Sequence, residues 1–221
     1  MKTFFVAFLL FIFTNSKTHL MNAKEYTYLA LGDSYTIGES VPANENFPNQ
    51  TTVLLRKKGY KFLSPEIIAK TGWTTDELQS TVNNYHLKNN YDLVTLLIGV
   101  NNQYRGRSID EYEKDFESLL KQAIQFAGNE TGHIIVLSIP DWGVTPFASG
   151  RDRLEIAKQI DKFNEINKNI STKHRVRYID ITAWTREAAS NLSLIAADGL
   201  HPSGKEYERW AKKITENFTL E

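Results

Sequence analysis

Short apolar segments alternate with longer amphipathic segments along most of this chain. The short segments predict five β-strands, at residues 26–31, 66–69, 93–98, 133–139 and 176–181. The longer segments predict helices at 47–58, 74–86, 108–127, 153–170 and 203–218. Apolar strands that alternate with helices form parallel sheets covered on both faces. We therefore expect an α/β fold, a three-layer α/β/α sandwich with a central, mainly parallel five-stranded sheet.

The helix predicted at 108–127 has a clear start signal. Ser108 stands where an N-cap residue would accept a hydrogen bond from the first turn. Glu111 follows three residues later, as in a capping box, and Tyr112 and Phe116 begin an apolar stripe. The pattern predicts a helix that is capped by Ser108 and buried along this stripe.

The beginning of the chain differs from the rest. Lys2 precedes an apolar run at 4–13, and polarity returns at Thr14. A basic start followed by about ten apolar residues is typical of a secretory signal peptide, whereas a membrane-spanning helix needs roughly 20. We expect a signal peptide at 1–16, a single domain at 17–221, a secreted or periplasmic location, and no stable membrane span after cleavage. An uncleaved anchor or a buried N-terminal helix is the alternative.

The composition narrows the classes of function. Hydrophobic residues make up 41% of the 221 residues, enough for a substantial buried core. Lys plus Arg and Asp plus Glu both number 26, and no basic block stands out, so no nucleic-acid partner is expected. Cysteine is absent, which excludes disulfides, a thiol nucleophile and thiolate metal ligands.

Polar residues suited to chemistry follow the predicted strands, at the sheet edge where α/β proteins bind ligands. Gly32, Asp33 and Ser34 follow the first strand, and a serine at such a strand–helix turn is a candidate nucleophile. Asp198 and His201 precede the last helix, and a histidine with a nearby acid is a candidate general base. The alternatives are an ordinary helix cap and a turn with an incidental surface histidine.

Two further loops offer hydrogen-bond donors for a negatively charged oxygen. Gly72 follows the second strand and can present a backbone N–H without a side chain in the way. Asn101 follows the third strand and can donate from its side-chain amide. Taken singly, both residue types are also common turn formers.

Together these residues resemble the four sequence blocks of the SGNH hydrolase superfamily, also called the GDSL-like lipase/esterase family, in the form seen in secreted bacterial members. Ser34, Gly72, Asn101 and His201 stand in the family's order, and the resemblance covers about residues 28–210. It implies the flavodoxin-like fold of that family.

The resemblance also implies a role for each residue. Ser34 is the nucleophile, His201 the base and Asp198 the acid that orients it. The backbone N–H groups of Ser34 and Gly72 and the side-chain amide of Asn101 form the oxyanion hole. The implied function is a serine esterase that hydrolyses carboxylic (acyl) esters through an acyl-enzyme intermediate, with no metal or organic cofactor.

The substrate and some alternatives stay open at this point. The ester is a small molecule, a lipid or an acylated carbohydrate, so a carbohydrate O-acetyl esterase and a lysophospholipase both fit the mechanism. A non-catalytic carbohydrate- or lipid-binding module on the same fold is another alternative. A flavodoxin-like nucleotide or flavin binder is a third, although no phosphate-binding glycine loop is present. Asp141, Trp142, Pro146 and Phe147, after the fourth strand, either wall the acyl pocket or belong to a packed loop.

Overall fold

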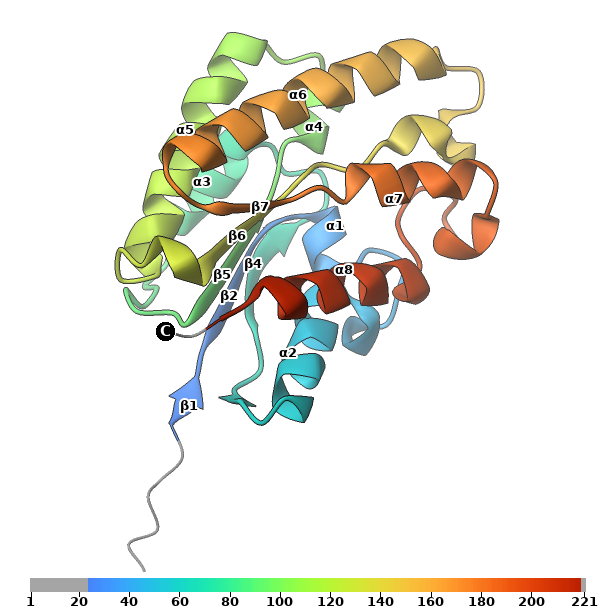
Figure 1. The fold of residues 1–221 in the computed structure, drawn as a ribbon. Coiled ribbons are helices and arrows are strands. Elements are labelled where there is room, and N and C mark those ends of the chain that lie inside the picture. Colours follow the sequence, from blue (N-terminus) through green and yellow to red (C-terminus); the bar gives the residue numbers. More distant parts are fainter. Residues whose placement is uncertain (1–23, 220–221) are drawn as a thin grey trace, which may run out of the picture.

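Five parallel strands form the central sheet of the computed structural model, which describes residues 24–219. They are β2 (Tyr28–Asp33), β4 (Glu66–Lys70), β5 (Leu93–Leu97), β6 (Ile134–Leu137) and β7 (Arg177–Ile179). Their order across the sheet is β4–β2–β5–β6–β7, and every neighbouring pair is parallel (Figure 1). The central strands β2, β5 and β6 are buried throughout, as expected where both faces are covered. The predicted fold class is confirmed.

Helices cover both faces of this sheet (Figure 1). They are α1 (Ser34–Ile37), α2 (Phe47–Lys57), α3 (Thr75–Asn84), α4 (Val100–Tyr104), α5 (Ile109–Phe126), α6 (Arg153–Lys173), α7 (Thr182–Arg186) and α8 (Gly204–Asn217). Helix α2 packs against α8, while α5 packs against both α3 and α6. Short 3₁₀ turns lie at Ala43–Glu45, Thr131–His133, Trp142–Val144, Pro146–Ala148, Glu187–Ala189 and Leu192–Leu194.

Helix α8 shows why the sequence folds in this way. Tyr207, Trp210 and Ile214 follow the i, i+3, i+7 spacing of one helix face, and all three are fully buried. The Trp210 ring packs against Phe47 of α2 with a centroid distance of 6.0 Å. Its indole N–H donates to the buried Glu206 at 2.8 Å, which satisfies the polar atom inside the core. This face ties α8, and the loop before it, to the rest of the fold.

The capping box predicted at Ser108 is wrong. Ser108 occupies the N-cap position of α5, but its side chain makes no capping hydrogen bond. The helix forms there nevertheless, because Tyr112 and Phe116 are fully buried along the predicted stripe. The capping box belongs instead to α3, where the Thr74 backbone N–H donates to the Glu77 carboxylate at 2.9 Å.

A small second sheet lies at the start of β2, where β1 (Glu25–Tyr26) pairs with β3 (Lys61–Phe62). The single predicted strand at 26–31 is therefore two strands, separated at Thr27. Phe62 stacks on Tyr26 and packs edge-on against Phe218, just after α8, with centroid distances of 5.4 and 5.5 Å. These aromatic contacts hold both ends of the described chain together.

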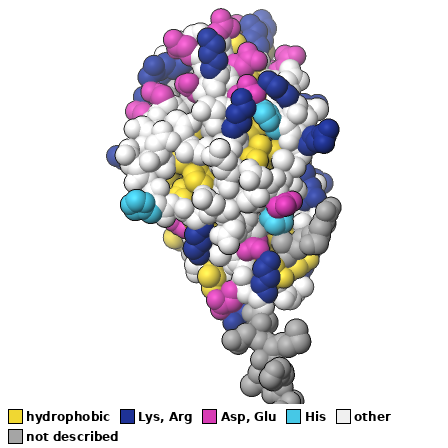
Figure 2. All heavy atoms as spheres, turned by 90° about the vertical axis from the view of Figure 1, so that its left-hand side faces the viewer, with side chains coloured by type: hydrophobic (Ala, Val, Ile, Leu, Met, Phe, Trp, Pro, Cys, Tyr) yellow, Lys and Arg dark blue, Asp and Glu magenta, His cyan; other side chains and the backbone are white. Residues whose placement is uncertain are grey.

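The surface carries mixed charge. On the face drawn in Figure 2, basic and acidic side chains of the described residues are interspersed and form no large block of one sign. None of the helices within residues 24–219 combines the length and apolar character that a membrane crossing requires. The predicted signal at 1–16 lies outside the described residues, and so does the start of the predicted domain at 17–221.

Candidate active site

The candidate residues meet at the carboxyl edge of the sheet. Ser34 directly follows β2, Gly72 lies in the turn after β4, and Asn101 lies in the first turn of α4, after β5. His201 comes from the loop that precedes α8. Because parallel strands end at the same edge, residues far apart in sequence lie together there.

The turn that carries Ser34 is fixed by its neighbours. A side chain on Gly32 would collide with the Thr36 hydroxyl and with the carbonyl oxygen of Leu97 on β5, so only glycine fits. Asp33 caps α1, since its Oδ1 accepts a hydrogen bond from the Tyr35 backbone N–H at 3.0 Å. Ser34 is thereby held at the strand–helix junction with 4% of its surface exposed.

The loop before α8 is also internally braced. An isolated antiparallel bridge joins Ile195 to Pro202, and the Ala196 N–H donates to the His201 carbonyl at 2.7 Å. Asp198 Oδ1 accepts from the backbone N–H groups of Leu200 at 2.9 Å and of His201 at 3.0 Å. The acid thus holds the turn that presents the imidazole, an arrangement typical of aspartate in tight turns.

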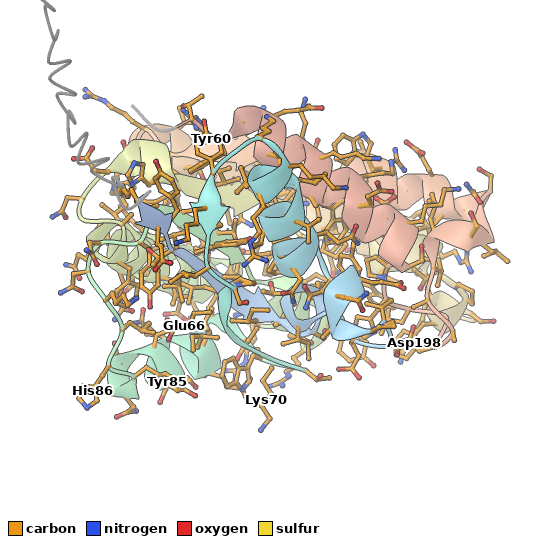
Figure 3. The ribbon with its side chains drawn as sticks, turned by 90° about the horizontal axis from the view of Figure 1, so that it is seen from below. Tyr60, Glu66, Lys70, Tyr85, His86 and Asp198 are labelled. Atoms are coloured by element: carbon orange, nitrogen blue, oxygen red, sulfur yellow. The ribbon has the colours of Figure 1, made fainter. Side chains whose placement is uncertain are left out.

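Ser34, His201 and Asp198 form a continuous hydrogen-bonded chain. Ser34 Oγ and His201 Nε2 lie 2.9 Å apart, and His201 Nδ1 and Asp198 Oδ2 lie 2.6 Å apart. His201 is 5% exposed and packs against the Tyr35 ring at a centroid distance of 4.9 Å. Asp198 lies at the edge of the molecule, beside the turn after α1 (Figure 3). The imidazole is therefore held between a hydroxyl and a carboxylate.

Two acids, Asp198 and Asp33, lie near Ser34 and His201, and their pKa values are shifted in opposite directions. Partial burial opposes ionisation of Asp198, but hydrogen bonds, above all from His201, outweigh it and lower the Asp198 pKa to about 2. Complete burial raises the Asp33 pKa to about 7, although hydrogen bonds from Tyr35 and Asn101 partly oppose the shift. Asp198 therefore faces His201 as a carboxylate, while Asp33 changes its charge near neutral pH.

The Asn101 amide points towards the end of β2. Its Nδ2 donates to the Trp73 carbonyl at 3.0 Å and lies 3.4 Å from Asp33 Oδ2, a long contact. The residue preceding Trp73, Gly72, has a positive φ of 84°, and its carbonyl accepts a hydrogen bond from the Arg105 guanidinium at 2.6 Å. Asn101 in α4 and Arg105 just after it thus fix the Gly72–Trp73 turn through their side chains.

A cavity of about 120 Å³ opens beside Ser34 and His201. Asn101 lines it as well, whereas Gly72 is not among the described residues that do. One wall of the cavity is aromatic, formed by Tyr104, Trp142 and Phe147. The three rings contact one another, with centroid distances of 5.3 Å, 6.0 Å and 6.2 Å. Of the four residues that the sequence singled out after the fourth strand, Trp142 and Phe147 line this cavity, whereas Asp141 and Pro146 are not among its described lining residues.

A second hollow of about 490 Å³ shares two rings of this wall, Tyr104 and Trp142. Its remaining lining is mainly polar and charged: Gln103, Gly106, Arg151, Asp152, Glu155, Ile156 and Gln159. The Tyr104–Trp142 pair therefore lines both a cavity with an aromatic wall and a polar hollow.

The structure thus gathers most of the residues that the sequence singled out. Ser34, His201 and Asp198 are hydrogen-bonded, and Asn101 lines the same cavity. Sequence reasoning missed Tyr104, although it lies three residues after Asn101 and so on the same helix face. Within residues 24–219, no three acidic or histidine side chains are grouped as metal ligands would be.

Comparisons with known proteins agree with this description. The sequence model of the GDSL-like lipase/acylhydrolase family matches residues 30–209. Among solved structures, a lipase/acylhydrolase from Enterococcus faecalis shares 20% identity at a TM-score of 0.66, covering 86% of this chain and 94% of its own. An acetylxylan esterase from Geobacillus stearothermophilus shares 19% identity at a TM-score of 0.67, covering 89% and 95%. These two likenesses show a shared fold. A search of curated proteins finds no match.

Proposed function

Since the chain belongs to the GDSL-like lipase/acylhydrolase family, we propose that it is a serine esterase that hydrolyses carboxylic esters through an acyl-enzyme intermediate on Ser34. The observation that carries this proposal is the hydrogen-bonded chain from Ser34 through His201 to Asp198, beside a cavity of about 120 Å³. Nucleophile, base and orienting acid are the parts that acyl transfer to serine requires.

In the first half-reaction, Ser34 Oγ attacks the ester carbonyl carbon while His201 Nε2 takes the hydroxyl proton. The imidazolium so formed is stabilised by the Asp198 carboxylate at Nδ1. His201 then returns the proton to the alcohol oxygen as the C–O bond breaks, and the acyl group remains on Ser34. In the second half-reaction, His201 activates a water molecule, which releases the carboxylic acid and restores the Ser34 hydroxyl.

The developing oxyanion needs donors that are in place before the reaction. We propose the Asn101 amide, the Ser34 N–H and the Gly72 N–H for this role. One amide hydrogen of Asn101 is held by the Trp73 carbonyl at 3.0 Å, while the contact to Asp33 is long at 3.4 Å. The second amide hydrogen is therefore the one that we propose donates to the oxyanion.

The aromatic cavity suits the acyl part of the substrate. The alcohol must leave before water enters, so the open side fits the alcohol and the enclosed side fits the acyl chain. A cavity of about 120 Å³ holds roughly four or five carbon atoms, by proportion to the roughly 150 Å³ apolar cavity that binds benzene. We propose short acyl chains as the preferred substrates.

The polar hollow beyond Tyr104 and Trp142 favours a polar alcohol. An acylated carbohydrate is therefore a second, more specific candidate substrate, since its hydroxyl groups can bond to the Gln, Arg, Asp and Glu side chains there. One of the structures with the same fold is described as an acetylxylan esterase. A lysophospholipid, with its long acyl chain, fits the cavity less well.

A panel of p-nitrophenyl esters with two to twelve acyl carbons tests the proposal, run beside acetylated xylan and lysophospholipid. Parent and Ser34→Ala proteins are compared throughout. Activity on the short esters that disappears in Ser34→Ala is expected. A protein that hydrolyses none of these esters, or whose Ser34→Ala variant keeps its turnover, would contradict the proposal.

We also propose export through a signal peptide at 1–16, on the order of basic, apolar and polar residues at the start of the chain. The corresponding mature domain, 17–221, would function outside the cytoplasm, where the lack of cysteine leaves stability to the core alone.

A further inference from the structure

Asp198 receives one contact from outside its own loop. Ser40, in the turn that follows α1, donates its hydroxyl hydrogen to Asp198 Oδ2 at 2.8 Å. The same oxygen lies 2.6 Å from His201 Nδ1, while Oδ1 is held by the backbone N–H groups of Leu200 and His201. Among the described residues, Ser40 thus supplies the one hydrogen bond to this carboxylate that comes from another part of the fold.

The backbone of Ser40 is strained. Its φ of 64° lies in the left-handed region, where glycine is at ease and most other residues are disfavoured. Among the described residues, the only other non-glycine residues with a positive φ are Asn129 and Arg175. Such strain persists where the surrounding structure enforces it, and here the strained residue contacts the acid of the proposed triad.

The turn around Ser40 is anchored to the nucleophile on one side and to the Gly72 loop on the other. The backbone N–H groups of Gly38 and Glu39 donate to the Ser34 carbonyl at 3.1 and 3.0 Å. The Glu39 carboxylate accepts a hydrogen bond from the Thr71 hydroxyl, next to Gly72. Ser40 therefore has a fixed position relative to Ser34 before it contacts Asp198.

Resting on the proposed esterase function, we propose that Ser40 is a positioning residue that keeps Asp198 Oδ2 directed at His201 Nδ1. The Asp198 side chain is 28% exposed, so water competes for its oxygens. Without the Ser40 hydroxyl, the carboxylate is held only by its own short turn and can rotate away from the imidazole. The tautomer and orientation of His201 are then less well defined, which slows proton transfer without removing any substrate contact.

Two substitutions separate this role from a purely structural one. Ser40→Ala removes the hydroxyl and keeps the strain, whereas Ser40→Gly removes both. We expect kcat to fall about 10-fold in both variants, with KM within about twofold, as for a lost hydrogen bond to a charged group. We expect Ser40→Gly to melt at or above the parent temperature, so that its lower activity cannot come from instability.

A spectroscopic readout and a matched control complete the test. The low-field proton NMR signal of His201 Nδ1–H should broaden or move in both Ser40 variants. Asn129→Gly makes the same backbone change at a φ of 67° far from the site, and should leave both kcat and this signal unchanged.

Parent-like kcat and an unchanged low-field signal in Ser40→Ala or Ser40→Gly overturn the inference, provided that Ser34→Ala is inactive. An active Ser34→Ala protein instead removes the proposed function on which the inference rests. The two failures are therefore distinguished by one additional variant.

Discussion

Asp33 ends β2 and Asn101 follows the neighbouring strand β5, and the two meet beside Ser34, where Asp33 Oδ2 lies 3.4 Å from Asn101 Nδ2. Asp33 is completely buried, and burial raises its pKa from the ordinary value of 3.8 to about 7. Between these two pH values the folded protein binds a proton that the unfolded chain has lost. Stability contributed by the neutral acid is therefore lost as the pH rises from about 4 to about 7.

Asp33→Asn should remove this dependence, because an amide does not titrate and its oxygen can still cap α1. The difference in free energy of unfolding, variant minus parent, should rise by about 2–4 kcal/mol from pH 4 to pH 8, because the parent loses stability over this range and the variant does not. One pKa unit corresponds to about 1.4 kcal/mol. Urea unfolding at several pH values measures it. A difference that stays constant with pH, or grows in favour of the parent, would contradict the raised pKa.

Ser34→Ala is expected to lower kcat for p-nitrophenyl esters by about 10⁶, as for other triad nucleophiles. Among the described residues, the serine hydroxyl is hydrogen-bonded to His201 alone, so the fold should persist. Purified parent and variant are compared by steady-state kinetics and by thermal melting. Near-normal turnover in a folded variant would remove Ser34 from the mechanism.

Asn101→Ala should lower kcat by about 10²–10³ with little change in KM, because the proposed contact forms mainly in the transition state. Asn102→Ala is the matched control. Its amide group bonds to Thr75 at 2.8 and 3.1 Å and does not line the cavity, so its loss should lower stability but not kcat. A change in KM alone for Asn101→Ala would assign the residue to substrate binding instead.

Phe147→Ala should lengthen the acyl chains that are accepted. In the parent, kcat/KM is expected to rise about 4-fold per methylene up to four or five acyl carbons, and then to fall. Removal of the half-exposed Phe147 ring opens the cavity and should move the maximum to longer chains. Leu154→Ala, at an exposed position of α6 outside the cavity lining, is the control. An identical chain-length profile in Phe147→Ala and the parent would place the acyl chain elsewhere.

Expression of the full-length chain in a secreting host should yield an exported protein that starts near Lys17. N-terminal sequencing of the exported and cytoplasmic fractions measures the cleavage. Leu9→Glu, which interrupts the apolar run, should abolish export and leave the chain uncut. Recovery of intact Met1 from the cytoplasm of the native host as the main product would argue against a signal peptide.

The elements that sequence predicted correctly are those with long, strong patterns. The central strands β2, β5 and β6 and the five long helices carry a buried apolar segment or stripe, so their existence follows from burial. The edge strands β4 and β7 are only partly buried and rest on shorter apolar segments. The bounds of all these elements shift by a few residues. The pairing of β1 with β3 was missed, because two-residue strands have no periodicity and are held by tertiary contacts such as that between Tyr26 and Phe62.

In the candidate site, too, residues in local sequence motifs were predictable, whereas those that depend on tertiary contacts were not. Ser34 and His201 were predictable because each stands in a short local motif at the end of a strand or before a helix. The contact of Ser40 with Asp198 joins positions 158 residues apart, and no local pattern of sequence indicates it. The left-handed backbone at Ser40 was not predictable either, because a serine in the sequence does not indicate a positive φ.

The aromatic contacts between Tyr26, Phe62 and Phe218 have a practical consequence. They place both ends of the described chain at the amino end of β2, whereas Ser34 stands at its carboxyl end, about 20 Å away for a six-residue strand. Figure 3 likewise shows Tyr60, which neighbours this cluster, well apart from Asp198. A protein immobilised on a support through either end would therefore keep the mouth of its cavity turned towards the solution.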